Sequence, residues 1–402
     1  MQQSLHLNAL LERNDSMKLK KTFIVKPTMD CNLRCEYCYE FRRNGKYYAK
    51  QSLSSCDLCN FMERVASVSP GAQILWLLHG GEPLIKCNAT YLSQFMERMR
   101  SVRDRFGVDY QLALQTNATL LTDEYVEVLV KNQDLLAERI VSVSIDGSRE
   151  ITDRARRFVD ARSSFDQVMR GISCIKRSGL KFSTISVIGS HNVDKPSDVY
   201  SFIKGLGGSL AKMIPCYNFD ESGSCEKLGV LPTEYAHFIC NIFDLWLRDF
   251  SYEKHDWFVI DPIATVLAKL SKSFVTWCEF RQEKCDNFLS VYPNGELWLC
   301  DALDHKTMRD FGYVGNFFTM SDNELRNALE RPCQLCKFSD FRASVMSECD
   351  KCGVYPLCQG GCLPTRYFMN QKSRKLAENY CLGKRIMFNY INEAYDDAQL
   401  ES

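Results

Sequence analysis

Three cysteines lie close together near the start of the chain, in the segment Cys31-Asn-Leu-Arg-Cys35-Glu-Tyr-Cys38. Three thiolates with this C-x3-C-x2-C spacing can bind three irons of a [4Fe–4S] cluster and leave the fourth iron without a protein ligand. Such an iron can bind a small molecule, so the spacing predicts a reactive cluster. A zinc site is the main alternative, but structural zinc sites use four ligands in two pairs.

Three further motifs follow the second, third and fourth predicted strands. The first is Gly80-Gly81-Glu82-Pro83, whose glycines permit close backbone approach and whose carboxylate suits an ammonium group. Gln115-Thr116-Asn117 closes the third strand, and Ser144-Ile145-Asp146-Gly147 closes the fourth. For the last motif an ordinary strand-to-turn transition is the alternative, since Asp-Gly is a common turn pair.

Alternating strands and helices are expected to position these motifs. Short apolar or β-branched runs bounded by turn residues predict strands at residues 22–26, 74–79, 111–116, 141–145, 182–188 and 212–217. Between them apolar residues recur at helical spacing, as in Leu58, Phe61, Met62 and Val65. The alternation predicts a parallel α/β sheet, open or closed into a barrel. Further helices are predicted at residues 232–251 and 386–395.

The composition excludes several classes of protein. Hydrophobic residues make up 45% of the 402, which is enough for a sizeable core and excludes a disordered chain. Lys+Arg and Asp+Glu each number 50, so the basic excess expected of a nucleic-acid binder is missing. No apolar run is long enough to span a bilayer, and the N-terminus lacks a signal-peptide pattern. We therefore expect a cytoplasmic protein with no nucleic-acid or membrane partner, whose twenty cysteines are not structural disulfides.

The cysteine triplet with its aromatic Tyr37, followed by the Gly-Gly-Glu-Pro motif, resembles the radical S-adenosylmethionine (SAM) enzymes. The resemblance implies an α/β fold with a partial (β/α)6 TIM-like barrel over residues 22–230, after an N-terminal extension at 1–21. It also implies SAM and a [4Fe–4S] cluster as cofactors, with Cys31, Cys35 and Cys38 as the cluster ligands. The implied SAM-binding residues are Tyr37, Gly80, Gly81, Glu82, Pro83, Gln115, Asn117, Ser144 and Asp146.

The C-terminal cysteines resemble the SPASM extension of these enzymes, which carries two auxiliary [4Fe–4S] clusters. The likeness is carried by the pattern C-x9-G-x4-C, a gap, C-x2-C-x5-C-x3-C, a gap and a final cysteine. It assigns four cysteines to each auxiliary cluster: Cys278, Cys285, Cys300 and Cys362 to the first, and Cys349, Cys352, Cys358 and Cys381 to the second. A pair of zinc ribbons is the alternative. The implied domains are a helical linker at 231–274, a cysteine-rich SPASM domain at 275–385 and a C-terminal helix and tail at 386–402.

Some conspicuous residues receive a structural interpretation. Nine cysteines stay outside the predicted clusters, among them the pairs Cys56/Cys59 and Cys333/Cys336, for which no partner pair is evident. The basic stretch Arg154, Arg156, Arg157 and Arg162 is expected to be a solvated charge run, with contact to SAM or an acidic peptide as the alternative.

Asp301, directly after Cys300, is a candidate catalytic base. The chain resembles the anaerobic sulfatase maturases, in which an aspartate at this place is the proposed base for oxidising a Cys or Ser side chain. A turn or ligand-orienting role is the alternative. The chain departs from the maturase pattern at His79 and Leu84, where maturases commonly carry Gln and Thr.

The resemblance implies an enzyme, a radical SAM oxidoreductase of the SPASM type. A 5′-deoxyadenosyl radical would abstract hydrogen from a peptide or protein side chain, and the auxiliary clusters would favour net oxidation. The predicted reaction is crosslinking of a ribosomally made precursor peptide through a carbon–carbon, ether or thioether bond. Formylglycine formation on a sulfatase and a non-catalytic iron–sulfur electron carrier are the alternatives. The expected partners are the peptide substrate and an external one-electron donor such as a flavodoxin or ferredoxin.

Overall fold

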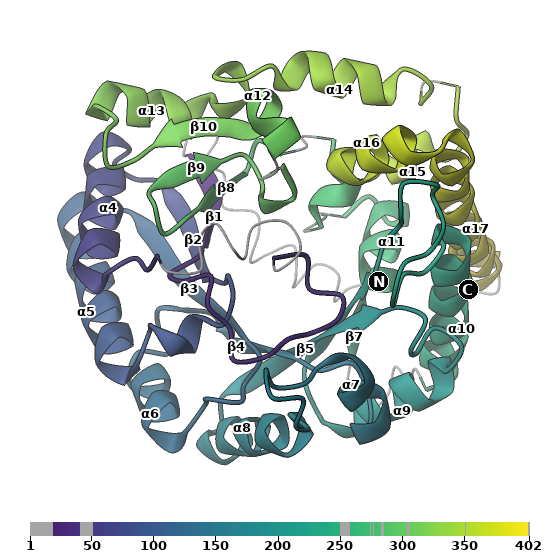
Figure 1. The fold of residues 1–402 in the computed structure, drawn as a ribbon, viewed down its shortest axis with the longest axis horizontal. Helices are drawn as coiled ribbons and strands as arrows, with labels where there is room; N and C mark the ends of the chain where they lie inside the picture. Colours follow the sequence, from purple (N-terminus) through teal and green to yellow (C-terminus); the bar gives the residue numbers. More distant parts are fainter. Residues whose placement is uncertain are drawn as a thin grey trace.

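One ten-stranded sheet forms the frame of the protein (Figure 1). The computed structural model describes residues 19–40, 51–249, 258–273, 275, 277–282, 285–303, 306–349 and 351–400, so most of the predicted N-terminal extension lies outside the described residues. The strand order is β10-β9-β8-β1-β2-β3-β4-β5-β6-β7. The strands are β1 (Lys20–Val25), β2 (Gln73–Leu78), β3 (Asp109–Thr116), β4 (Leu136–Ser144), β5 (Lys181–Ile188), β6 (Leu210–Pro215), β7 (Val259–Asp261), β8 (Phe288–Val291), β9 (Glu296–Trp298) and β10 (Tyr313–Asn316).

The strands β1 to β7 run parallel to their neighbours, and helices cover the outside of the curved sheet (Figure 1). The prediction of an α/β fold with a partial barrel is confirmed, and each of the six predicted strands corresponds to one of β1 to β6. The helices of this part are α4 (Ser55–Val68), α5 (Ala89–Phe106), α6 (Asp123–Lys131), α7 (Arg149–Ala155), α8 (Phe165–Ser178), α9 (Pro196–Gly205), α10 (Pro232–Asp249) and α11 (Ile263–Leu270).

The alternation of side chains along β2 separates the packed outer face of the sheet from its inner face. Ile74, Trp76 and Leu78 are buried, while the residues between them are partly exposed. The outer face is packed with aromatic rings, as where Phe23 of β1 meets Trp76 edge to face with 4.7 Å between ring centroids. Because side chains alternate, His79 continues the inner row of β2, and its backbone N–H still donates to the β1 carbonyl of Val25.

The cysteine-rich region joins the same sheet, because β8 pairs in parallel with β1. β9 and β10 then continue the sheet antiparallel. The other elements of this region are the 3-10 turns η2 (Cys278–Phe280), η3 (Asp301–Leu303), η4 (Lys306–Met308) and η5 (Pro332–Gln334), and the helices α12 (Arg309–Gly312), α13 (Asp322–Glu330), α14 (Phe338–Met346), α15 (Tyr355–Cys358) and α16 (Leu363–Lys372).

Two elements differ from the sequence-based expectations. β7 lies within the predicted helical linker, where three residues are too few to give a recognisable strand pattern. The predicted C-terminal helix is the end of α17 (Arg374–Leu400), which begins before Cys381 and packs on α10 and α16. The cysteine pattern predicts the end of a domain near Cys381, so it does not indicate where this helix begins. The buried residues nevertheless keep helical spacing on both sides of Cys381: Leu376, Tyr380, Lys384, Met387, Phe388 and Ile391.

Among the described residues, no helix is both long and apolar enough to cross a lipid bilayer.

Candidate functional site

The loop after β1 carries Cys31, Cys35 and Cys38, all three partly buried. It is fixed to the segment after α7, since Arg34 N–H donates to the carbonyl of Arg157 at 2.8 Å and Glu36 N–H to that of Ala155 at 3.0 Å. The three thiols are therefore held at the carboxyl edge of the sheet, which is where parallel α/β folds place their sites.

The environment of these thiols fits metal ligands. Burial raises the pKa of Cys31 to about 12 and that of Cys35 to about 11. Thiols in such surroundings keep their protons unless a cation compensates the thiolate charge, as iron does. The donor set of three sulfurs on one short loop thus fits a cluster with one iron left open.

The glycines of the loop after β2 are needed to pack this loop against the start of the cysteine loop. A Cβ atom on Gly81 would lie 2.2 Å from the carbonyl oxygen of Asp30, and one on Gly80 would lie 2.6 Å from that of Thr28. The N–H of Gly81 donates to Thr28 O and that of Glu82 to Asp30 O. Side chains at either position would push the two loops apart.

Glu82 connects this loop with the end of β3. Its buried carboxylate accepts hydrogen bonds from Thr116 Oγ1 at 2.7 Å, from Asn117 N at 2.7 Å and from Leu84 N at 3.1 Å. Burial raises the pKa of Glu82 despite these donors. Because this carboxylate lacks a full counter-charge among the described residues, it fits a positively charged ligand group such as an ammonium. Pro83 starts the short turn η1 (Pro83–Ile85) behind it.

Asn117 joins the third motif to the cysteines. Its Nδ2 donates to Asn32 Oδ1 at 3.0 Å and lies 3.8 Å from Cys31 Sγ. Two residues earlier, Gln115 is in register with Ser142 of β4. Ser144 is the last residue of β4 and is partly exposed. The structure therefore brings the first three predicted motifs into direct contact, and Asp146 of the fourth contacts the cysteine loop through Tyr37.

The predicted residues Tyr37 and Asp146 bind each other within a buried polar network. Tyr37 OH donates to Asp146 Oδ2 at 2.6 Å, and Arg156 Nη1 donates to Tyr37 OH at 2.7 Å. Val187 N donates to Asp146 Oδ1, and His191 Nε2 lies 3.6 Å from Asp146 Oδ2. Burial alone would raise the pKa of Asp146, but His191 and the Arg156 charge lower it below its usual value. The network ties the cysteine loop to the ends of β4 and β5.

Arg156 corrects one expectation. The basic stretch to which it belongs was expected to be solvated, but Arg156 is 7% exposed and bonded to Tyr37. A carboxylate and a guanidinium are both buried here, and a charge distribution of this kind cannot be read from a run of basic residues alone.

Changing Asp146 to Asn should destabilise the protein by about 1–3 kcal/mol, because it removes the buried carboxylate charge that accepts from Tyr37 OH and faces the Arg156 charge across it. The free energy of unfolding, measured in denaturant on the metal-free protein, checks this. Asp166→Asn is the matched control, since Asp166 pairs with Arg149 on the exposed surface and its removal should change stability little. Equal stability of the two variants would show that the buried network does not hold the loop.

The four cysteines assigned to auxiliary cluster one gather around Cys300, which follows β9. Burial raises the pKa of Cys300 well above its usual value, and the nearby charges of Asp301, Cys285, Cys278 and Cys362 raise it further. These cysteines come from positions far apart in the sequence, so their meeting is a property of the fold.

The four cysteines assigned to auxiliary cluster two line a single cavity of about 590 Å³ together with Arg366. Arg366 Nη1 lies 2.9 Å from Cys349 Sγ. A guanidinium beside thiols favours their deprotonated form and offsets the negative charge of a thiolate-ligated cluster. The cavity and its charge fit an iron–sulfur cluster at this position.

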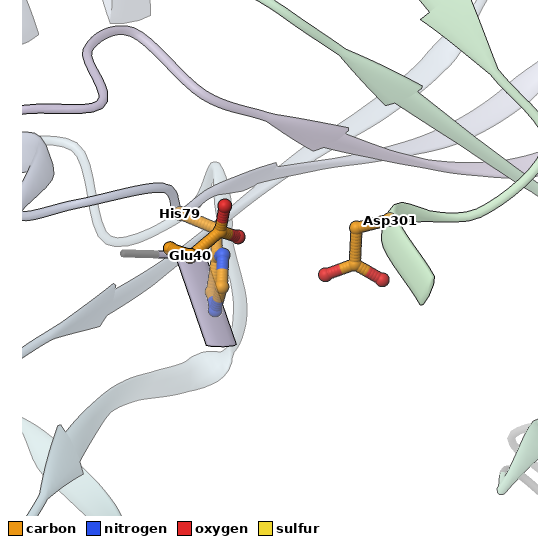
Figure 2. Close-up of side chains that lie close together, drawn as sticks. All are labelled: Glu40, His79 and Asp301. Atoms are coloured by element: carbon orange, nitrogen blue, oxygen red, sulfur yellow. The ribbon is translucent and has the colours of Figure 1, made fainter. Parts of the chain in front are cut away.

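A further cluster of polar side chains joins the cysteine loop to the cysteine-rich region (Figure 2). Glu40, His79 and Asp301 offer ligand-type atoms that all lie within 4.8 Å of one another. Tyr39 OH donates to Asp301 Oδ2 at 2.7 Å, and Lys26 Nζ lies 4.0 Å from the same oxygen and bonds to Glu40. Burial alone would raise the pKa of Asp301, but the Lys26 charge, the nearby His79 imidazole and the Tyr39 hydrogen bond lower it. Asp301, the candidate base, is therefore an ionised carboxylate that lies between the loop carrying Cys38 and the loop carrying Cys300.

Sequence reasoning named Asp301 but assigned no role to Glu40 or Lys26, and noted His79 only as a departure from a pattern. A signal was present, because each residue of the cluster adjoins a motif: Glu40 lies two residues after Cys38, His79 one before Gly80, and Asp301 one after Cys300. That signal becomes meaningful only when the three motifs are known to meet.

Comparison with known proteins gives consistent similarities in sequence. Residues 25–203 match the Radical SAM superfamily. The chain is 26% identical to a serine-type anaerobic sulfatase-maturating enzyme of Bacteroides thetaiotaomicron, over 92% of this chain and 88% of that protein. It is 25% identical to a cysteine-type anaerobic sulfatase-maturating enzyme of Clostridium perfringens, over 92% of this chain and 95% of that protein.

Solved structures with related folds cover nearly the whole chain. Native anSMEcpe with bound AdoMet superposes with a TM-score of 0.78 at 22% identity, covering 94% of this chain and 98% of that one. Streptococcus suis SuiB bound to the precursor peptide SuiA superposes with a TM-score of 0.60 at 15% identity, covering 91% and 77%. At these identities the likeness concerns the fold.

Proposed function

We propose that this chain is a radical SAM maturase that oxidises a side chain of a peptide or protein, because residues 25–203 match the Radical SAM superfamily. As such an enzyme it would use SAM and a [4Fe–4S] cluster as its cofactors. Two observations support a peptide substrate: the curated relatives are named as sulfatase-maturating enzymes, and one structural neighbour is bound to a precursor peptide.

The residues that would hold the cofactors are those the fold brings together. Cys31, Cys35 and Cys38 would bind the first cluster. Glu82 and its neighbours Gly80, Gly81, Pro83, Gln115 and Asn117 would bind the methionine end of SAM, and Tyr37, Ser144 and Asp146 would shape the ribose side. Since Asp146 is already bonded to Tyr37 and Val187, its contribution is to hold the cysteine loop in place as much as to touch a ligand.

Two auxiliary [4Fe–4S] clusters complete the proposal. The thiols around Cys300 and the cavity beside Arg366 each supply four cysteines, as a cluster without an open iron requires. A zinc ribbon would place a smaller ion among the same sulfurs.

The number and kind of bound metal ions distinguish auxiliary iron–sulfur clusters from zinc ribbons. Anaerobically reconstituted protein should contain about twelve iron and twelve sulfide per chain, the content of three cubane clusters. Iron and sulfide analysis with metal quantification by mass spectrometry measures this. About four iron with two to four zinc would contradict the auxiliary clusters while leaving the SAM-binding cluster in place.

One observation carries the proposed chemistry: Asp301 is bonded to Tyr39, so the loop that follows Cys38 and the loop that follows Cys300 meet at one carboxylate. When bound, SAM and the iron–sulfur clusters would supply one-electron chemistry, that is, removal of a hydrogen atom and then an electron from the substrate. A substrate side chain oxidised in this way must also lose a proton. Asp301, ionised and adjacent to both loops, is positioned to take it.

The residues around the Asp301 carboxylate keep it ionised and exclude water from it. Lys26 and Tyr39 hold Asp301 in its ionised form, and Glu40 neutralises the buried ammonium of Lys26. These contacts place a proton acceptor in surroundings from which solvent is largely removed, so that the proton passes to the protein and not to bulk water.

We favour crosslinking of a ribosomally made precursor peptide as the reaction. His79 and Glu40 place an imidazole and a second carboxylate close to Asp301, which suits activation of a substrate side chain. Formylglycine formation on a sulfatase is the second candidate, and the similarity to serine-type and cysteine-type maturating enzymes favours it.

Mass spectrometry of a peptide co-expressed with the enzyme tests the proposal, the peptide being encoded beside the enzyme gene. Crosslinking removes two hydrogens and leaves no group that reacts with a hydrazine. Formylglycine formation leaves an aldehyde that a hydrazine traps. An unmodified peptide and an unmodified neighbouring sulfatase would contradict both.

A further inference from the structure

Glu40, His79 and Asp301 bring acceptor atoms to within 4.8 Å of one another, and we call this group of side chains, labelled in Figure 2, the acceptor pocket. Glu40 is 3% exposed, and its Oε2 has no hydrogen-bond partner among the described residues. The same holds for His79 Nδ1. An imidazole nitrogen without a proton accepts a hydrogen bond, and burial lowers the pKa of His79, which favours that form. Buried polar atoms without partners are uncommon and indicate a ligand that the site receives.

The charge of the acceptor pocket selects the kind of ligand. Among the described residues, two carboxylates, Glu40 and Asp301, face a single ammonium, Lys26, so one carboxylate charge is uncompensated there. Burying an uncompensated charge is costly. A group with a single positive charge makes the pocket neutral, whereas a divalent metal ion would leave an excess positive charge beside Lys26.

The size of the acceptor pocket also suits an organic cation. Its three ligand atoms lie within 4.8 Å of one another. An ammonium nitrogen that donates over about 2.8–3.0 Å can reach acceptors separated by up to this distance.

The position of the acceptor pocket indicates that the ligand is the substrate. Its three residues adjoin Cys38, Gly80 and Cys300, so it lies where the proposed radical chemistry and the proposed base meet. His79 is only partly buried and continues the inner row of β2, so the acceptor pocket is reached from the inside of the curved sheet.

We propose that the acceptor pocket binds a positively charged side chain of the substrate peptide, a lysine ammonium or an arginine guanidinium, at or next to the residue that is oxidised. The peptide as occupant rests on the proposed function, but the preference for a cation does not depend on which bond is made.

Binding of short probe peptides to the reconstituted enzyme, with S-adenosylhomocysteine in place of SAM to prevent turnover, tests this. The probes are acetyl-Gly-Lys-Gly amide, its arginine counterpart, and the uncharged counterparts with norleucine and citrulline. Calorimetry should show that a charged probe binds about tenfold or more tightly than its uncharged counterpart, the scale of a buried charge-assisted hydrogen bond. The lysine and arginine pairs show which cation is preferred. Equal binding of charged and uncharged probes, or no binding of either, would overturn the proposal.

Three variants test the charge argument. Glu40→Gln makes the empty acceptor pocket neutral and should abolish the preference for the charged probe. The double variant Lys26→Met/Glu40→Gln restores one negative charge, now on Asp301, and should recover the preference. This variant also removes both members of the buried ion pair, so it remains informative where Glu40→Gln folds poorly. Glu63→Gln, which removes a carboxylate bonded to Arg98 and Arg105 elsewhere, is the control and should keep the preference.

The outcomes separate this inference from the proposed function. If the double variant shows no preference while Glu63→Gln does, a charge-based pocket is excluded. If the enzyme binds one equivalent of Zn²⁺ or Mn²⁺ that Glu40→Gln loses, and does not discriminate between the probes, the acceptor pocket is a metal site and the proposal is wrong. Because no turnover is needed, a failed modification assay beside a retained preference would contradict the proposed function and not the cation pocket.

Discussion

Protein in which Cys31, Cys35 and Cys38 are all replaced with alanine is expected to release no 5′-deoxyadenosine from SAM. These sulfurs sit on one short loop, and the buried positions of Cys31 and Cys35 suit thiolates only when a metal compensates their charge. Without them the open iron, and with it the reductive cleavage of SAM, is lost. Since the bound cluster carries out the cleavage of SAM, no side chain elsewhere in the protein can replace the lost activity.

Chromatographic assay of 5′-deoxyadenosine under anaerobic reduction measures this loss, and iron analysis accompanies it. Iron should fall by about a third, from twelve to eight per chain, because the two auxiliary clusters keep their ligands. The matched control replaces three cysteines outside the proposed clusters, Cys56, Cys59 and Cys225, and should keep both iron and activity. Continued SAM cleavage by the first variant would exclude the proposed site.

Replacing Asp301 with asparagine should separate SAM cleavage from product formation. The change keeps the shape of the side chain but removes its ability to take a proton, a role that typically contributes about 10²–10⁴-fold to a rate. Modified product should fall by about that factor, while 5′-deoxyadenosine continues to form, since Glu82 and the cysteine triplet are untouched.

Single-turnover reactions that quantify 5′-deoxyadenosine and modified peptide together measure this separation. Tyr39→Phe is the companion variant, because it removes the hydrogen bond to Asp301 and keeps the base. Its product should fall much less than that of Asp301→Asn. Unchanged product with Asp301→Asn would show that Asp301 is not the base, and equal losses of product and SAM cleavage would indicate a structural role beside Cys300.

The barrel could be predicted from sequence because its signals are local. Each of β1 to β6 is a run of apolar residues with turn residues at both ends, and each motif lies just beyond the end of one of them. β7 has only three residues and depends on pairing with β6, so no local pattern reveals it. The continuity of α17 was hidden by Cys381, whose cluster assignment suggested the end of a domain.

The candidate site could be predicted in part for the same reason. Motif spacing named the cysteines, Glu82 and Asn117, and the fold brings these residues together. The acceptor pocket could not be predicted, since it depends on contacts between segments as distant as Tyr39 and Asp301, which are 262 residues apart. The role of Arg156 was missed for a related reason, because its burial comes from packing against Tyr37 and not from its own basic neighbours.

Joint quantification of 5′-deoxyadenosine and modified peptide in one anaerobic reaction, with the peptide encoded beside the enzyme gene, tests the central claim most directly. The account predicts that the two products form together in a ratio of about one to one, and that both vanish in the Cys31/Cys35/Cys38 alanine variant. A peptide modified without 5′-deoxyadenosine, or 5′-deoxyadenosine formed while every candidate peptide and neighbouring sulfatase stays unmodified, would contradict it.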